Sequence, residues 1–273
     1  MARIVIYDSG VGGLTIYQRL VQRLAKAVDQ HSLVFVSDNE AYPYGTKTES
    51  QLLKRVSQLA DSITQTYNPD ILVVACNTAS TLALDSLRAR LSCEVVGVVP
   101  AIKPAALLSE TNTIGLLATP ATIKRDYTND LIATFAKHCT VVKVGSSDLV
   151  EAAEAKLSGQ QLDSALLAQV LQPFIKCEEM DVLVLACTHF PILANEISAA
   201  FKSNNRSVSV IDSGEAIAKR IINLSKRAAI ESHPHPSIAS FTEILKKDNN
   251  LIVGLKEIGF LDVHHLKIKQ NEI

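Results

Sequence analysis

The chain has 273 residues, of which 47% are hydrophobic and 20% are charged, and its formal net charge is −1 at pH 7. This length and composition fit a globular protein of about two domains of ~150 residues each. The balanced charge and the scattered lysines and arginines argue against nucleic acid as the main ligand. No apolar stretch approaches the ~18 residues of a membrane span, so we expect a soluble, cytoplasmic protein that does not bind membranes.

Strands and helices alternate from the start of the chain. Residues 4–7 form the first predicted strand, and apolar residues at helical spacing over residues 14–28 predict the helix that follows. A second strand is expected over residues 33–36, then a loop over residues 38–47. Thr48 and Gln51 resemble a capping box that opens a helix, which ends at Asn68-Pro69. The next elements are a strand that runs to Cys76, a helix over residues 79–91 and a strand over residues 95–99.

The second half of the chain continues the same alternation. Its predicted strands cover residues 114–117, 141–144, 182–186 and 208–211. Its predicted helices cover residues 123–137, 151–156, 164–175, 192–201 and 215–229. A loop around His233 and His235 and a small strand, helix and strand complete the chain. Alternation of this kind predicts an α/β fold with parallel sheets and right-handed crossovers.

Two stretches of the chain are near copies of each other, and both end in cysteine. Residues 70–76 read Asp-Ile-Leu-Val-Val-Ala-Cys, and residues 181–187 read Asp-Val-Leu-Val-Leu-Ala-Cys. Each is typical of a strand buried on both faces, and ligands of open α/β sheets bind at the carboxyl ends of strands. A single free cysteine is usually a small buried hydrophobe, but two in one motif favour chemistry. Matched thiols could remove a proton from one face of a carbon acid and return one to the other face.

The five cysteines are odd in number and include no C-x-x-C spacing, so we expect neither a structural zinc nor a disulfide framework.

Asp8 and Ser9 directly follow the first strand, and the glycines after them could bind an anion or form an ordinary tight turn. The pattern is not a dinucleotide fingerprint. At this edge of the sheet Asp8 could orient or activate Cys76.

Further candidates lie at the same edges. Tyr44 and Gly45 follow the second strand, where turn chemistry alone could explain them. Asn77, Thr78 and Thr188 follow the two cysteines and could serve only as helix caps, although a helix start also offers donors to a ligand. His189 could stabilise Cys187 as imidazole or imidazolium.

The residues described so far carry a resemblance to a known family. The chain resembles the cofactor-independent glutamate racemases over residues 4 to about 220. The motifs that carry it are Asp8-Ser-Gly-Val-Gly-Gly-Leu-Thr15, Tyr42-Pro-Tyr-Gly45, Ala75-Cys-Asn-Thr-Ala-Ser80, Gly97-Val-Val-Pro100, Ala118-Thr-Pro-Ala-Thr122, Ala186-Cys-Thr-His-Phe-Pro191 and Ile211-Asp-Ser-Gly-Glu-Ala216. The two cysteine motifs distinguish glutamate racemases from the related aspartate racemases.

The resemblance implies a fold of two similar α/β domains that face each other across a central cleft with pseudo-symmetry. The first domain would comprise residues 1–98 with 211–273, and the second residues 99–210. The implied activity is the interconversion of L- and D-glutamate without cofactor or metal, which supplies D-glutamate for peptidoglycan. A homodimer and regulation by an effector both stay open.

The resemblance also assigns roles to residues. Cys76 and Cys187 would be the acid/base thiols, with Asp8 assisting the first, His189 assisting the second and Glu151 near the second. The residues implied to hold the substrate are Asp8, Ser9, Tyr44, Gly45, Asn77, Thr78, Thr188 and His189. The family often has Asp-Thr in the loop before Pro-Tyr-Gly, whereas this chain has Asp38-Asn39, so a substrate contact from Asn39 is not implied.

Three alternatives stay open on the sequence alone. A racemase for aspartate or another small amino acid would differ only in the groups that hold the distal carboxylate. A ligand-binding module could share two α/β lobes but would have no need for a thiol in each. A thiol hydrolase built on Cys187 and His189 would leave Cys76 without a role.

Overall fold

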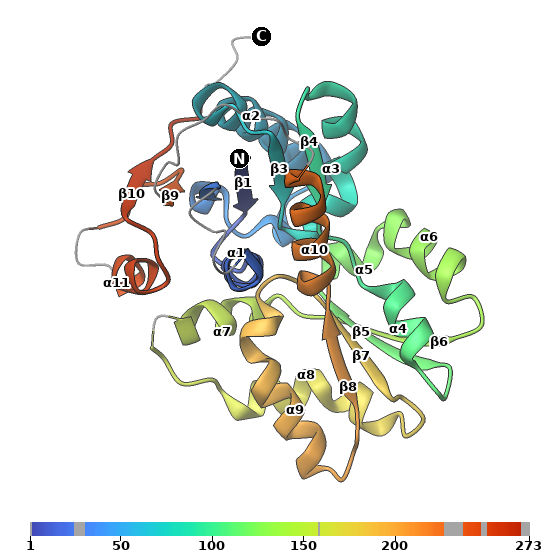
Figure 1. Ribbon diagram of the computed structural model, residues 1–273. Coiled ribbons are helices and arrows are strands. Elements are labelled where there is room, and N and C mark those ends of the chain that lie inside the picture. The colour runs from blue at the N-terminus through green and yellow to red at the C-terminus, as the bar shows by residue number, and fades with distance from the viewer. Residues whose placement is uncertain (1, 25–30, 158, 227–236, 247–249, 269–273) are drawn as a thin grey trace. The chain divides into compact units, whose positions relative to one another are not determined.

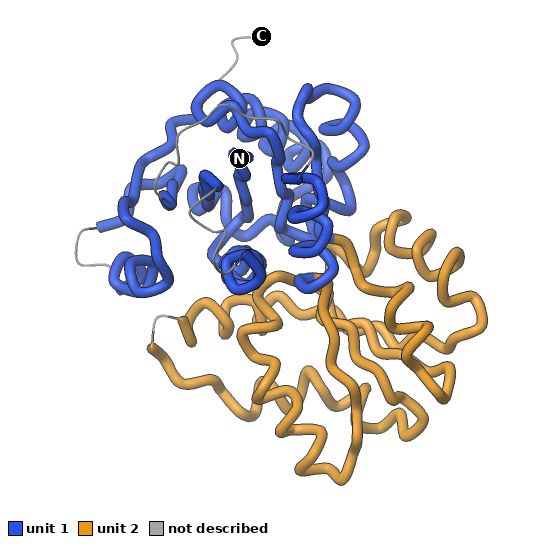
Figure 2. The backbone as a smooth tube through the Cα atoms, viewed as in Figure 1, with its two compact units in different colours: residues 1–98, 214–273 blue, residues 99–213 orange. Residues whose placement is uncertain are grey.

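The computed structural model describes residues 2–24, 31–157, 159–226, 237–246 and 250–268 (Figure 1). The parts of the predicted helices that reach residues 28 and 229, and the loop with His233 and His235, lie outside these residues. The chain divides into two compact units (Figure 2): unit 1 comprises residues 1–98 and 214–273, and unit 2 comprises residues 99–213. The second boundary, expected at residue 210, falls at residue 213.

Unit 1 is built on a six-stranded parallel sheet with the strand order β10-β9-β2-β1-β3-β4. The strands are β1 (Arg3–Asp8), β2 (Ser32–Ser37), β3 (Ile71–Val74), β4 (Glu94–Gly97), β9 (Ile238–Phe241) and β10 (Asp262–His265). The helices are α1 (Leu14–Leu24), α2 (Glu49–Tyr67), α3 (Asn77–Arg90), α10 (Gly214–Ser225) and α11 (Asn250–Glu257). Short 3-10 helices η2 (Asn39–Ala41) and η3 (Tyr44–Thr46) follow β2.

Side chains that alternate along β1 enter two different cores of unit 1. Ile4 and Ile6 pack in the core on the side of α1, α10 and α11. Val5 and Tyr7 pack in the core on the side of α2 and α3. This alternation follows from the period of two in a strand, and burial on both faces explains why residues 4–7 of β1 are all hydrophobic.

The predicted capping box at the start of α2 is confirmed. The Thr48 hydroxyl accepts from the Gln51 backbone N–H, and the Gln51 side chain accepts from the Thr48 backbone N–H. The helix ends at Asn68, which adopts a left-handed conformation with φ of 42° before Pro69. Asparagine tolerates that conformation, and proline cannot continue the helix.

Unit 2 contains a four-stranded parallel sheet with the order β6-β5-β7-β8. Its strands are β5 (Thr113–Ala118), β6 (Thr140–Gly145), β7 (Val182–Ala186) and β8 (Ser209–Asp212). Its helices are α4 (Ile102–Leu108), α5 (Pro120–Lys124), α6 (Asp126–Phe135), α7 (Asp148–Leu157), α8 (Ser164–Lys176) and α9 (Ala194–Ser203), with the 3-10 helix η4 (Phe190–Leu193) before α9. Two parallel-sheet α/β units were predicted, and both are confirmed.

Two helical details of unit 2 differ from the predictions. The single helix expected over residues 123–137 is two helices, α5 and α6, because Arg125 between them is extended with ψ of 137°. Helix α4 was not predicted. Its Pro104 occupies the first turn, where a missing N–H costs no intrahelical hydrogen bond, so the proline does not prevent the helix.

The aspartates that open the two repeated stretches both bind backbone N–H groups. The Asp70 carboxylate accepts from Arg3 N at 2.6 Å. The Asp181 carboxylate accepts from the Ser109 hydroxyl at 2.6 Å and from Glu110 N and Thr111 N at 2.7 and 3.1 Å. Burial acts to raise the pKa of Asp181, but these hydrogen bonds outweigh it and lower that pKa.

Among the described helices, none is both long and apolar enough to cross a membrane.

Candidate active site

Cys76 lies just beyond the carboxyl end of β3 and is the N-cap residue of α3. Its side chain is buried, and its Sγ atom is 3.6 Å from the Ser9 hydroxyl oxygen. The Ser9 hydroxyl donates to Asp8 Oδ1 at 3.2 Å, and Gly10 N donates to the same oxygen at 3.1 Å. The structure thus links Cys76 to the Asp8 carboxylate through a hydroxyl, in the order thiol, Ser9, Asp8.

The close approach of the Asp8 turn to β3 requires glycine at position 13. A Cβ atom at Gly13 would lie 2.9 Å from Asp8 Cβ and 3.0 Å from Ala75 Cβ. Real Cβ atoms do not approach side chains from two strands this closely, so a larger residue would push the start of α1 away. Gly13 therefore lets Asp8 and Ser9 sit next to the segment that carries Cys76.

The turn with Tyr44 and Gly45 is fixed by a buried carboxylate. The Tyr44 hydroxyl donates to Asp38 Oδ2 at 2.5 Å, and both side chains are buried. Arg55 donates to both Asp38 oxygens, at 2.8 Å from Nε and 2.5 Å from Nη2, and the Thr242 hydroxyl adds a bond of 2.8 Å. Burial, and then the charge of Asp38, raise the pKa of Tyr44 well above its usual range.

Sequence reasoning missed Asp38 and Arg55 as residues of this site. The available signal was position, because Asp38 follows β2 as directly as Asp8 ends β1, and Asp38 N donates to Asp8 O at 2.8 Å. The hydroxyl of Tyr44 is bound to Asp38, so the turn that it anchors is held rigidly at the carboxyl edge of the sheet. Gly45, in the middle of η3, is partly exposed there.

The two residues after Cys76 are buried within the start of α3. The Asn77 side chain donates from Nδ2 to the Val98 carbonyl at 3.0 Å, which ties the helix start to the segment after β4. The Thr78 carbonyl accepts from the Thr81 hydroxyl at 3.3 Å, and the Thr78 side chain is only 3% exposed. The structure therefore gives Asn77 a positioning contact beside the thiol.

Cys187 follows β7 in unit 2 as Cys76 follows β3, but its partners differ. Its Sγ atom is 3.8 Å from His189 Nδ1, and both side chains are buried. His189 Nε2 is in turn 2.8 Å from Glu154 Oε1 on α7. Thr188, buried between these two residues in sequence, precedes the 3-10 helix η4. The order here is thiol, imidazole, carboxylate.

The carboxylate beside His189 belongs to Glu154, whereas the resemblance implied Glu151. Glu151 lies one turn earlier on α7 and is exposed. Both residues are glutamates on the same short helix, so the sequence alone could not decide which of them faces His189. The arrangement has a clear chemical use. A carboxylate at Nε2 holds a proton on that nitrogen, which leaves Nδ1 to exchange a proton with, or stabilise, the Cys187 sulfur.

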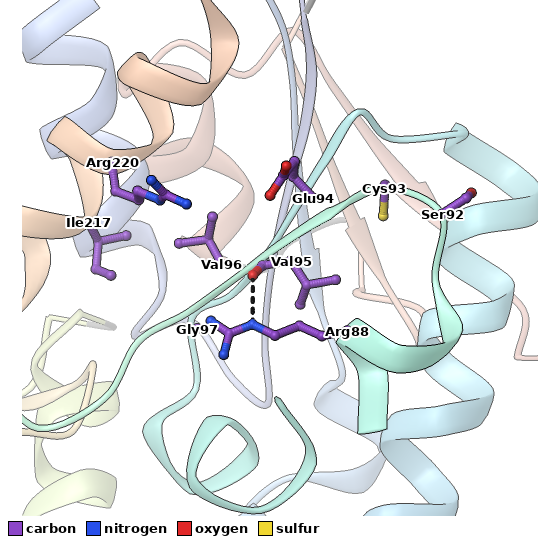
Figure 3. Close-up of a pocket in the computed structure, with 9 residues that line it drawn as sticks. All are labelled: Arg88, Ser92, Cys93, Glu94, Val95, Val96, Gly97, Ile217 and Arg220. Atoms are coloured by element: carbon purple, nitrogen blue, oxygen red, sulfur yellow. Dashed lines mark hydrogen bonds between the residues drawn. The ribbon is translucent and has the colours of Figure 1, made fainter. Parts of the chain in front are cut away.

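Unit 1 also contains a cavity of about 650 Å³ at its edge strand β4 (Figure 3). Arg88, near the end of α3, and Arg220, on α10, both line it, and they reach β4 from its two sides. Arg88 Nε donates to the Val95 carbonyl at 3.3 Å. Ser92, Cys93 and Glu94 complete the polar part of the lining, and burial raises the pKa of the Cys93 thiol. Two guanidinium groups at one cavity provide donors for an anion.

Each unit, then, ends its repeated strand in a buried thiol with a polar relay that leads to a carboxylate, which defines a duplicated α/β protein with one buried thiol at the carboxyl end of a strand in each half. The chain belongs to the Asp/Glu/hydantoin racemase family, whose family model matches residues 8–221.

Individual members of the family are similar over most of their length. The chain is 46% identical to a glutamate racemase of Vibrio vulnificus (strain YJ016), with 94% of both chains covered. It is 48% identical to a glutamate racemase of Shewanella sp. (strain MR-4), again with 94% of both covered. The structure of Escherichia coli glutamate racemase in complex with L-glutamate and the activator UDP-MurNAc-Ala superposes with a TM-score of 0.89 at 38% identity, covering 98% of this chain and 99% of that one.

Proposed function

We propose that this protein is a cofactor-independent glutamate racemase, an isomerase that interconverts L- and D-glutamate. The observation that carries the proposal is the repeated strand with a buried thiol at its end, Cys76 in unit 1 and Cys187 in unit 2. The glutamate racemases to which the chain is 42–48% identical support glutamate as the substrate over aspartate. The product D-glutamate would enter peptidoglycan, and the enzyme would act in the cytoplasm.

The proposed reaction uses each thiol in both of its protonation states. One cysteine, as thiolate, takes the α-proton of glutamate, and the electron pair of the C–H bond stays on the substrate as a carbanion. Hydrogen bonds to the α-carboxylate stabilise this charge. The other cysteine, as thiol, then delivers its proton to the opposite face of the same carbon and becomes the thiolate. The enzyme thus ends the turnover ready for the reverse direction.

The polar relays would assist the two proton transfers. Asp8, through the Ser9 hydroxyl, orients the proton of Cys76, and His189, held by Glu154, stabilises the ionised form of Cys187. Backbone donors and hydroxyls near the thiols, among them those of Ser9, Thr78 and Thr188, would hold the substrate's charged groups. Asn77 and the turn of Tyr44 and Gly45 would position them.

The test is to incubate the purified protein with L-glutamate in D₂O without added cofactor. Optical rotation reports inversion, and the α-proton NMR signal reports exchange with solvent. We expect both signals to decay together. Turnover of L-aspartate at a rate equal to or above that of L-glutamate would reject the substrate assignment. If neither L-glutamate nor L-aspartate exchanges its α-proton, the racemase proposal is rejected in favour of a binding protein.

We further propose that the cavity at β4 binds an anionic activator. The E. coli enzyme was crystallised with an activator that contains a uridine diphosphate group. A diphosphate requires several donors with positive charge, and Arg88 and Arg220 both line this cavity. The β4 cavity lies within unit 1 and is lined by no residue of the thiol relays, so a ligand there would act on the rate from a separate site.

Activation is tested by adding UDP-MurNAc-Ala to the wild type and to Arg88→Gln and Arg220→Gln. We expect the wild type to be activated and each variant to need at least about tenfold more activator, since each loses one charged hydrogen-bonding group. Arg90→Gln, at the end of the same helix but outside the cavity lining, is the control. An equal response of all four proteins would reject this cavity as the activator site.

A further inference from the structure

Tyr7 is the next-to-last residue of strand β1 and directly precedes Asp8. Its side chain is completely buried. It points to the α2 and α3 side of the sheet, where it shares a core with Tyr44 and Cys76. The backbone connects it to the thiol segment as well, because Ala75 N donates to the Tyr7 carbonyl at 2.8 Å. The phenol therefore enters the core directly beside the strand that ends in Cys76.

The hydroxyl of Tyr7 is buried and has no hydrogen-bond partner among the residues that the structure describes. An unpaired buried hydroxyl costs about 1–3 kcal/mol, and a phenylalanine of the same shape would avoid that cost. Tyr44, the other phenol of this core, differs because its hydroxyl is bound to Asp38. Packing alone thus explains the ring of Tyr7 but not its oxygen.

The ionisable groups around the Tyr7 hydroxyl indicate which of them it could donate a hydrogen bond to. Burial raises the pKa of Tyr7 well above its usual range, and the charges of Cys76, Asp38 and Asp8 raise it further in that order. Tyr44 interacts with the phenol too, and Arg55 is bound to Asp38. The Asp8 carboxylate, which Ser9 links to Cys76, opposes formation of a thiolate there. The phenol of Tyr7, in the same core as Cys76, is a neutral O–H donor of the kind that offsets such a charge.

We propose that Tyr7 is a positioning residue for Cys76, whose phenolic O–H donates to the sulfur when Cys76 is ionised. The structure shows no hydrogen bond between the phenol and the sulfur, so formation of the thiolate must draw these two groups together. This inference rests on the proposed racemase function for its kinetic consequence. Unit 1 would in this way supply to its thiolate the stabilisation that unit 2 obtains from an imidazole.

The test compares the wild type with Tyr7→Phe. The ultraviolet absorbance of the thiolate, taken as the difference between each protein and its Cys76→Ala counterpart, gives the titration midpoint of Cys76. We expect Tyr7→Phe to raise this midpoint by about one pH unit, the shift expected from the loss of one hydrogen bond to a charged group. The midpoint of Cys187, measured against Cys187→Ala, should not move.

Kinetics give a second readout that a structural role would not change. In the direction in which Cys76 is the base, the acid limb of kcat/KM should move to higher pH in Tyr7→Phe. In the reverse direction Cys76 must carry a proton, so the alkaline limb should move to higher pH by the same amount. The melting temperature should stay equal to or above that of the wild type.

Tyr17→Phe is the matched control, because Tyr17 is a buried tyrosine in the core on the opposite face of the same sheet. It should shift neither midpoint. An unchanged Cys76 midpoint in Tyr7→Phe, or an equal shift of both thiols, would overturn the proposal. Because the titration needs no turnover, a wild type that fails to racemise glutamate would count against the proposed function while the titration still decides the role of Tyr7.

Discussion

In unit 1 the thiol at the end of β3 is backed by a hydroxyl and a carboxylate, whereas in unit 2 the thiol at the end of β7 is backed by an imidazole and a carboxylate. The strands and the thiols are repeated, and the relays behind them are not. A serine hydroxyl passes or orients a proton without becoming charged, while histidine can take up a proton and carry it. The two halves therefore share their strands and thiols but differ in the groups that are placed to exchange a proton with each thiol.

Removal of either thiol should reduce activity more than any other single substitution considered below. Cys76→Ala and Cys187→Ala should each lower the rate of racemisation by at least about 10³-fold, since each removes a group that transfers the substrate proton. The assay is optical rotation with each glutamate enantiomer. Cys177→Ala, a thiol at the end of α8, should keep full activity. Equal racemisation by a single-thiol variant and the wild type would show that the substituted thiol takes no part in the reaction.

Isotope exchange should show which enantiomer each thiol deprotonates. In each single-thiol variant, the α-proton of the enantiomer that faces the remaining cysteine can still exchange with D₂O without inversion. The enantiomer that loses its proton in Cys187→Ala is therefore the one handled by Cys76. Opposite preferences in the two variants are expected, and the same preference in both would contradict a thiol on each face.

The next effect concerns the fixed turn of unit 1. Arg55→Ala should lower the free energy of unfolding by about 3 kcal/mol, because it leaves the buried Asp38 carboxylate without its cation. Chemical denaturation measures this loss. Arg23→Ala, which removes an exposed ion pair with Glu215, should cost less than about 1 kcal/mol. A loss for Arg55→Ala as small as for Arg23→Ala would mean that Tyr44 and Thr242 alone hold Asp38.

A smaller effect tests the relay of unit 2. Glu154→Gln should reduce kcat/KM by about tenfold, or ~1.4 kcal/mol, because the amide no longer fixes the His189 proton by charge. The matched variant Glu151→Gln lies on the exposed part of the same helix and should have near wild-type kinetics. The reverse result would assign the carboxylate role to Glu151.

The smallest effect is a stability change that depends on pH. The pKa of Asp181 is lowered in the folded protein, so its charge stabilises unit 2 above the unfolded pKa of about 3.9. This contribution is lost as the pH falls through the lower folded pKa. Asp181→Asn should therefore cost about 1 kcal/mol at neutral pH and progressively less in acid, as measured by urea denaturation. Asp130→Asn, an exposed control in unit 2, should show no such pH dependence.

Local patterns were enough to predict the parallel strands, the thiols at their ends and the capping box of Thr48. Each of these depends on residues close in sequence, such as the apolar run before Cys76. The bonds that complete the site span long separations, and a single sequence does not reveal them. Glu154 meets His189 from another helix, and Thr242 reaches Asp38 across 204 positions. The Thr119 cap starts the short helix α5, and the extended Arg125 that separates it from α6 has no marker in the apolar pattern of the sequence.

The hydrogen bond from Thr242 to Asp38 bears on how the protein forms during synthesis. Unit 2 is one continuous segment, whereas unit 1 joins residues 1–98 to residues 214–273. Strands β9 and β10, which extend the sheet next to β2, are synthesised after the whole of unit 2. Domains fold as units, and contacts between distant segments form slowly. We therefore expect unit 2 to fold first during synthesis, and the Asp38 cluster of unit 1 to form only after β9 and Thr242 have emerged.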